Sequence, residues 1–162
     1  MEKILDEVQK QQFLDLVENA QRVVVCPHVN PDGDAVGSSL AIMHWLRKQG
    51  KCAHVVVPNA FPEFLQWLPG ADEVIIYARN ADEAKERLQQ ADLVVIADLN
   101  SSSRLGAMEE MVLAVEAPRI MIDHHMDPSA FCQLVISQPQ MCATAEVWCH
   151  VLSQLSQIEH LS

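Results

Sequence analysis

The sequence is poor in aromatic residues, in basic residues and in long apolar runs, and each shortage argues against a class of protein. Aromatic residues make up 5% of the 162 positions, so the core must be mainly aliphatic. No stretch approaches the roughly 18 consecutive apolar residues of a membrane-spanning helix, so we expect no membrane partner. The 11 lysines and arginines are outnumbered by 22 acidic residues, giving a net charge of -11. Duplex nucleic acid is bound mainly through basic side chains, so we expect no long duplex as partner. A short phosphorylated substrate is still compatible with this negative charge, because bound cations can make the electrostatic potential of a site positive.

The five cysteines also lack a recognisable pattern. Their number is odd and no two of them are spaced as CxxC, which argues against a disulfide framework. The first twelve residues are polar and do not resemble a signal peptide. Both observations favour a reducing, cytoplasmic location.

Short apolar runs alternate with helically spaced apolar residues along the chain. Hydrophobic residues make up 49% of the sequence, enough for one domain with a sizeable core. We expect strands at 22–26, 52–58, 73–77, 92–97, 119–122 and 132–137, and helices at 5–20, 35–49, 80–90 and 143–158. Strands buried on both faces that alternate with helices predict an α/β fold, a mostly parallel sheet with helices on both faces. We expect Val8 to point inward from the first helix, and Trp45, Trp67 and Trp148 to be buried in the core.

Three of these strands end in residues that can bind a metal. The first is followed by "HVNPDGDAVGS", the fourth by "DLNSSSRLG" and the fifth by "DHH"; the candidates are His28, Asp32, Asp34, Asp98, Asp123, His124 and His125. Ligands of open α/β sheets bind beyond the carboxyl ends of the strands, so these side chains can converge. Each alone could be a helix cap or turn residue, and Asp34 could cap the helix that begins at Ala35. Capping does not account for all three strand ends together.

The residue types indicate the ion. Carboxylates and imidazoles without thiolates favour Mn²⁺ or Mg²⁺, with Zn²⁺, Co²⁺ and Fe²⁺ as alternatives. Crowded carboxylates repel one another unless cations lie between them, which predicts two ions about 3.5–4 Å apart with a bridging carboxylate. Such a pair activates water for displacement at phosphorus. We expect Gly33 and Gly37 to let the backbone fold tightly around the ions.

With these residues in place, the chain resembles the DHH phosphoesterase superfamily. "HVNPDGDAVGS" is similar to its first motif, "ADLNSSSRLG" to its second, and "DHH" at 123–125 to its third. "CATAEVW", residues 142–148, resembles a segment of the branch that contains nano-RNases, 3′-phosphoadenosine 5′-phosphate phosphatases and exopolyphosphatase-related proteins. The resemblance covers roughly residues 10–155.

The resemblance implies a role for each motif residue. One ion would be held by His28, Asp32 and Asp98, and the second by Asp34, Asp98 and His124, which makes Asp98 the bridge and a catalytic residue. His125 would contact the substrate phosphate or transfer a proton, and Asp123 would orient a neighbouring histidine. For Arg104, a phosphate contact and a plain surface position are equally weighted alternatives.

The implied function is hydrolysis of short phosphorylated nucleotides, either short oligoribonucleotides or nucleoside 3′,5′-bisphosphates, with Mn²⁺, Mg²⁺ or Co²⁺. Two alternatives stay open: an exopolyphosphatase, pyrophosphatase or cyclic dinucleotide phosphodiesterase, and a catalytically incomplete domain that binds a nucleotide or a partner chain. The family also has a fourth motif and a smaller substrate-binding domain that are not found in this sequence, so we expect residues 1–162 to be a C-terminally truncated DHH domain. The oligomeric state is open, with a homodimer among the alternatives.

Overall fold

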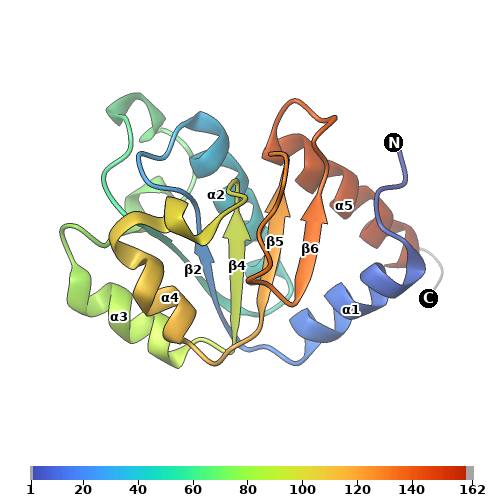
Figure 1. Ribbon diagram of the computed structural model, residues 1–162, viewed down its shortest axis with the longest axis horizontal. Coiled ribbons are helices and arrows are strands. Elements are labelled where there is room, and N and C mark those ends of the chain that lie inside the picture. The colour runs from blue at the N-terminus through green and yellow to red at the C-terminus, as the bar shows by residue number, and fades with distance from the viewer. Residues whose placement is uncertain (1, 160–162) are drawn as a thin grey trace.

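Six parallel strands form one sheet at the centre of the molecule, in the order β3-β2-β1-β4-β5-β6. The computed structural model describes residues 2–159, with side chains to residue 155. The strands are β1 (Arg22–Cys26), β2 (Cys52–Val57), β3 (Ile75–Ile76), β4 (Leu93–Ala97), β5 (Arg119–Asp123) and β6 (Leu134–Ser137). All arrows in Figure 1 point the same way, so the carboxyl ends of the strands share one end of the sheet.

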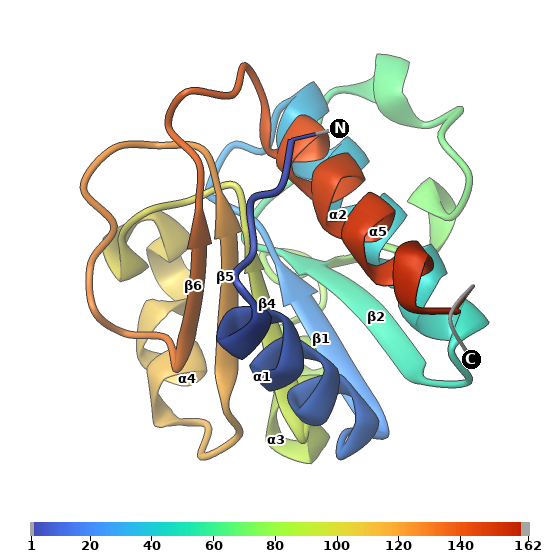
Figure 2. The same ribbon diagram turned by 90° about the vertical axis from the view of Figure 1, so that its right-hand side faces the viewer.

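Helices cover both faces of this sheet. They are α1 (Glu7–Glu18), α2 (Gly33–Lys48), α3 (Ala81–Gln90), α4 (Glu109–Ala114) and α5 (Thr144–Glu159), with short 3₁₀ helices η1 (Glu63–Leu65), η2 (Ala71–Glu73) and η3 (Ser102–Met108). Alternate residues of β1 enter different cores: Val23 and Val25 pack with α1, α2 and α5, whereas Val24 and Cys26 pack with α3 and α4. Figure 2 shows α1, α2 and α5 together on one face. The predicted α/β fold with a parallel sheet and helices on both faces is confirmed.

The order of the strands reverses between β1 and β4. The chain leaves β1 through α2 toward β2 on one side, and leaves β4 toward β5 on the other. In open α/β sheets this switch point, at the carboxyl ends of the strands, is where ligands bind. The segments after β1, β4 and β5 all begin here.

Two expectations for the core were wrong. Val8 is 76% exposed, because the inward face of α1 is formed instead by Phe13 and Val17. Trp67 is also 76% exposed, whereas Trp148 is buried and Trp45 packs against it with ring centroids 5.4 Å apart.

The strand expected at 73–77 is shorter, since only Ile75–Ile76 pairs with β2. Among residues 2–159, no helix is both long and apolar enough to cross a membrane.

The segment before α1 is attached to α5 by one buried side chain. The Gln154 Oε1 atom accepts hydrogen bonds from the backbone N–H groups of Ile4 (2.8 Å) and Leu5 (2.9 Å). The Gln154 Nε2 atom donates to the Leu5 carbonyl at 3.1 Å. Three backbone groups of the N-terminal segment are therefore satisfied by one glutamine, and Leu5 is inserted in the core.

We predict that Gln154→Met destabilises the chain by about 1–3 kcal/mol, because it keeps the side-chain volume but leaves buried backbone groups unsatisfied. Urea unfolding followed by circular dichroism measures the change. The control is Gln89→Met on the exposed face of α3, which should change the free energy of unfolding by less than about 0.5 kcal/mol. Equal effects of the two substitutions would show that Gln154 does not hold the N-terminal segment.

Candidate metal centre

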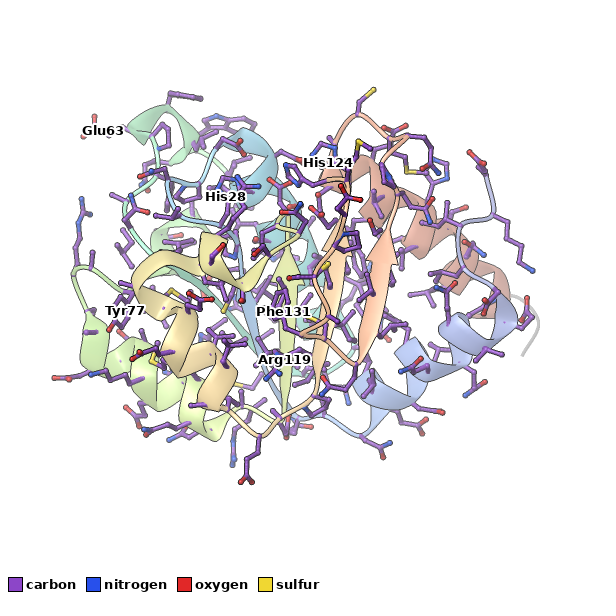
Figure 3. The ribbon with its side chains drawn as sticks, in the orientation of Figure 1. His28, Glu63, Tyr77, Arg119, His124 and Phe131 are labelled. Carbon is purple, nitrogen blue, oxygen red and sulfur yellow. The ribbon has the colours of Figure 1, made fainter. Side chains whose placement is uncertain are left out.

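The predicted residues meet at the carboxyl end of the sheet, at the switch point between β1 and β4. His28 and Asp32 follow β1, Asp34 lies in the first turn of α2, Asp98 follows β4, and Asp123, His124 and His125 end and follow β5. Figure 3 shows His28 and His124 at this end of the molecule, away from Arg119 at the start of β5. Three separate segments of the sequence thus supply one cluster of carboxylates and imidazoles.

Asp98 lies at the centre of this cluster. Its Oδ2 atom is 3.4 Å from His28 Nε2, and its Oδ1 atom is 3.5 Å from His124 Nε2. The side chain is only 3% exposed, and Oδ1 accepts a hydrogen bond from the Thr144 hydroxyl at 3.0 Å. The backbone of Asp98 is left-handed, with φ of 62°, a conformation uncommon for residues other than glycine. The two oxygens of one buried carboxylate therefore face two different histidines.

Both histidines turn the same nitrogen toward the carboxylates. His28 Nδ1 is 2.7 Å from the carbonyl of Val29, and His124 Nδ1 is 3.2 Å from the carbonyl of Met141. Because a carbonyl only accepts, we assign the ring proton to Nδ1 in each case. The Nε2 lone pair of each neutral ring is then directed at Asp98 and is available to an ion.

Asp32 caps the N-terminus of α2. Its Oδ1 accepts a hydrogen bond from Ala35 N at 2.9 Å and lies 3.8 Å from His28 Nε2. The alternative in which Asp34 caps this helix was wrong, because α2 begins at Gly33, two residues earlier than predicted. Gly33 and Gly37 are both helical and have no positive φ, so the expected tight fold of the glycine backbone around an ion is not present.

Asp34 points from α2 toward the first turn of α5. Its two oxygens accept hydrogen bonds from the backbone N–H groups of Thr144 (2.8 Å) and Ala145 (2.9 Å). Oδ2 is also 3.6 Å from His124 Nε2. Burial raises the pKa of Asp34, the two N–H donors oppose this, and the neighbouring Asp98 carboxylate raises it further. Burial and the neighbouring carboxylate thus disfavour the ionised form of Asp34. A cation bound between the two carboxylates would stabilise that form.

The electrostatics of Asp98 and His28 are complementary. Burial would raise the pKa of Asp98, but the adjacent His28 ring, the hydrogen bond from Thr144 and the nearby His125 ring outweigh it and lower the pKa. The interaction with Asp98 raises the pKa of His28 against the effect of burial. Asp98 is therefore held in its anionic form, the form that binds a metal.

The spacing of these atoms fits a divalent ion. The Nε2 to carboxylate distances of 3.4–3.8 Å exceed a normal hydrogen bond. Ligands that each lie about 2.0–2.2 Å from one ion are roughly 3–3.5 Å apart. Two groups of ligand atoms within 4.8 Å of one another are present, His28 with Asp32 and Asp98, and Asp98 with His124 and His125. Asp98 belongs to both groups.

His125 differs from the other two histidines. Its Nδ1 is 2.7 Å from Asp123 Oδ1, and its backbone N–H donates to Asp123 Oδ2 at 3.0 Å. Asp123 is completely buried at the end of β5, so it fixes the ring of His125. Although Nδ1 is 3.9 Å from Asp98 Oδ1, its proton is directed at Asp123. Its Nε2 lies 3.4 Å from the Arg104 guanidinium, a position that suits contact with a substrate phosphate better than binding an ion.

Arg104 is brought next to His125 by the η3 segment. The Arg104 Nη1 atom is 3.4 Å from His125 Nε2, and the Arg104 carbonyl accepts a hydrogen bond from Val29 N at 2.7 Å. Gly106 has φ of 57°, and a Cβ there would lie 3.3 Å from the Val29 side chain. The absence of a side chain at Gly106 thus lets η3 approach the loop after β1. The structure places the guanidinium beside the cluster.

Thr144 is a residue of the site that the sequence does not indicate. It is completely buried, its hydroxyl binds Asp98 and its N–H binds Asp34. In the sequence it could be read simply as the start of a helix. A threonine at the first position of a closing helix carries no signal of its own for a contact with residues 46 and 110 positions away.

We predict that Mn²⁺ at millimolar concentration raises the thermal unfolding midpoint of this chain, because an ion that binds only the folded state stabilises it. Asp98→Asn should abolish the shift, since it removes a ligand common to both groups. Asp72→Asn, at an exposed carboxylate of η2, should retain the full shift. An Asp98→Asn variant that still responds to Mn²⁺ like the parent chain would refute the assignment of this cluster.

The chain is similar to proteins of known activity and structure. It is 33% identical over 125 residues to the bifunctional oligoribonuclease and PAP phosphatase NrnA of Thermus thermophilus, an alignment that covers 77% of this chain and 34% of that protein. It is 27% identical over 141 residues to the cyclic-di-AMP phosphodiesterase GdpP of Bacillus subtilis, over 82% of this chain and 21% of that protein. The crystal structure of an exopolyphosphatase-related protein from Bacteroides fragilis superposes with a TM-score of 0.91 at 38% identity, over 94% of this chain and 45% of that one.

The chain thus spans about a third or less of the length of these two curated relatives. The model of the DHH family, N-terminal domain, matches residues 22–161, a range that contains every residue of the metal centre. This chain belongs to the DHH family and corresponds to its N-terminal domain.

Proposed function

We propose that the protein containing this chain is a divalent-metal-dependent phosphoesterase that hydrolyses short phosphorylated nucleotides. The observation that carries the proposal is the buried carboxylate of Asp98, whose two oxygens face His28 and His124 separately. Membership of the DHH family and the similarity to NrnA and GdpP support it.

In this proposal the residues around Asp98 hold two ions. His28, Asp32 and Asp98 would bind one, and Asp34, Asp98 and His124 the other. Carboxylate and imidazole ligands suit Mn²⁺, with Mg²⁺ and Co²⁺ as alternatives. When bound, such a pair supplies an activated water and positive charge for displacement at phosphorus. The carbonyls of Val29 and Met141 keep the histidine Nε2 atoms turned toward the site.

His125 and Arg104 would act on the substrate. Asp123 holds the Nδ1 proton of His125, which leaves Nε2 to exchange a proton with a substrate oxygen. The Arg104 guanidinium, 3.4 Å from this nitrogen, would bind a phosphate oxygen. Asp123 thereby orients the histidine and does not itself contact the substrate.

A nucleotide substrate is supported by NrnA, which is named an oligoribonuclease and PAP phosphatase. The names of the other relatives favour two alternatives, a cyclic dinucleotide phosphodiesterase and an enzyme of the exopolyphosphatase group. A panel on the full-length protein separates them: a 5′-phosphorylated diribonucleotide, a nucleoside 3′,5′-bisphosphate, a cyclic dinucleotide, pyrophosphate and tripolyphosphate. The proposal requires one of the first two to be turned over fastest. Turnover of none of the five would favour a catalytically incomplete binding domain.

We predict that Asp98→Asn in the full-length protein lowers Mn²⁺-dependent hydrolysis by about 10³-fold or more, because the residue shared by both ligand groups is lost. Initial rates on the best substrate of the panel measure this effect. The control Asp72→Asn should leave the rate within about twofold. Survival of the activity in the Asp98 variant would contradict the proposal.

A second substitution separates the substrate contact from the ion ligands. His125→Gln should lower kcat by about 10²–10⁴-fold, the usual contribution of a positioned acid or base. The increase in thermal midpoint on adding Mn²⁺ should remain, because Nδ1 of His125 is directed at Asp123 and not at an ion. Loss of that increase would show instead that His125 is a ligand.

A further inference from the structure

Exposed apolar side chains gather at the same end of the sheet as the metal centre. Among the described residues, the exposed large hydrophobic side chains include Val29, Phe64, Trp67 and Met126, which follow the carboxyl ends of β1, β2 and β5. Phe64 and Trp67 are the aromatic pair, with 72% and 76% of their surface exposed. Aromatic rings so exposed in a chain with 5% aromatic residues need an explanation.

Each of these two aromatic residues is followed by a leucine that packs against the core. Successive 3₁₀ bonds run from Leu65 N to Pro62 O, from Gln66 N to Glu63 O and from Leu68 N to Leu65 O. Phe64 lies within η1 and Trp67 in the turn that follows it, and both side chains are exposed. Leu65 is buried in the core and Leu68 packs against it. The aromatic pair is therefore presented outward by a segment that the two leucines anchor.

This segment is attached to the loop that carries the metal ligands. Leu65 Cδ2 lies 3.9 Å from the position of a Cβ on Gly33, the residue between Asp32 and Asp34. The loops after β1 and β2 are joined by two hydrogen bonds of 2.7 Å, from Asn30 N to Asn59 Oδ1 and from Asn59 Nδ2 to Asn30 Oδ1. In Figure 3, Glu63 lies at the same end of the molecule as His28.

The charge of the chain limits how else a nucleotide could be held. With a net charge of -11, the chain as a whole repels phosphate, and Arg104 is the guanidinium beside the metal centre. Beside the phosphate contacts that the metal centre and Arg104 would supply, a nucleotide can therefore gain further affinity from its uncharged base. Stacking of a base on an aromatic ring supplies such affinity and does not depend on the charge of the protein.

We infer that Phe64 and Trp67 form a platform on which a nucleobase of the substrate stacks while the phosphate lies at the metal centre. The inference rests on the proposed function and deepens it. Inorganic polyphosphate has no group for this platform, so the platform favours nucleotides over inorganic substrates.

The kinetic test uses the full-length protein with Mn²⁺ and two substrates, the diribonucleotide pApA and the same diester with abasic riboses. Trp67→Ala should raise KM for pApA by about 5- to 150-fold, the cost of losing one base stack, and leave kcat within about twofold. Trp67→Phe should recover most of the affinity. KM for the abasic diester should not change, and Val8→Ala, at an equally exposed side chain on α1, should affect neither substrate. An unchanged KM for pApA in Trp67→Ala, or an equal rise for both substrates, would overturn the inference.

An equilibrium test does not require turnover. Adenosine 5′-monophosphate should quench the tryptophan fluorescence of the full-length protein, whereas ribose 5-phosphate should not. Trp67→Phe should lose the quenching, because Trp45 and Trp148 are packed against each other and Phe13. Quenching without hydrolysis of either pApA or a nucleoside 3′,5′-bisphosphate would refute the proposed function and support the platform. Quenching that persists in Trp67→Phe would overturn the platform. So would a full-length protein that shows no quenching and whose Trp67→Ala variant has a lower thermal midpoint, because Trp67 would then be covered by another protein surface.

Discussion

The interaction on which the site depends is the burial of the Asp98 carboxylate between His28 and His124. Burying a charge is costly unless it is paired and hydrogen-bonded. The Thr144 hydroxyl donates one hydrogen bond to Asp98, and the Nε2 atoms of His28 and His124 lie where, together with Asp98, they would hold a cation that pairs with its charge. The strand order makes the meeting possible, because β1 and β4 are neighbours at the point where the order reverses. Moving either strand would separate the histidine after β1 from the aspartate after β4.

Helix α5 connects this centre to the rest of the molecule. Its first turn donates two backbone N–H groups to Asp34, and such N–H groups at a helix N-terminus stabilise a carboxylate. Further along α5, Gln154 binds the segment before α1. Helix α5 therefore binds the candidate metal ligand Asp34 through its first turn and binds the N-terminal segment through Gln154, near its other end. Its packing against α2 brings Asp34 and Thr144 together.

The sequence predicts the parts of this arrangement that depend on local pattern. Continuous apolar runs identify β1, β4 and β5, and the parallel sheet follows from their alternation with helices. The convergence of His28, Asp98 and His124 then follows from the shared carboxyl edge. Contacts between distant segments carry no such pattern. Asp34 is two residues from the true helix cap, and only the position of α5 determines that it binds Thr144 and Ala145. Trp67 was expected in the core because hydropathy does not register the 3₁₀ turns that direct it outward.

In the proposed site the Asp98 carboxylate lies between two ions. Electron paramagnetic resonance of the full-length protein titrated with Mn²⁺ tests it most directly, since two neighbouring Mn²⁺ ions that share a carboxylate are magnetically coupled. We predict a coupled signal that reaches its maximum at two equivalents of Mn²⁺ per chain and is absent in Asp98→Asn. Saturation at one equivalent, or a signal of isolated ions only, would contradict it.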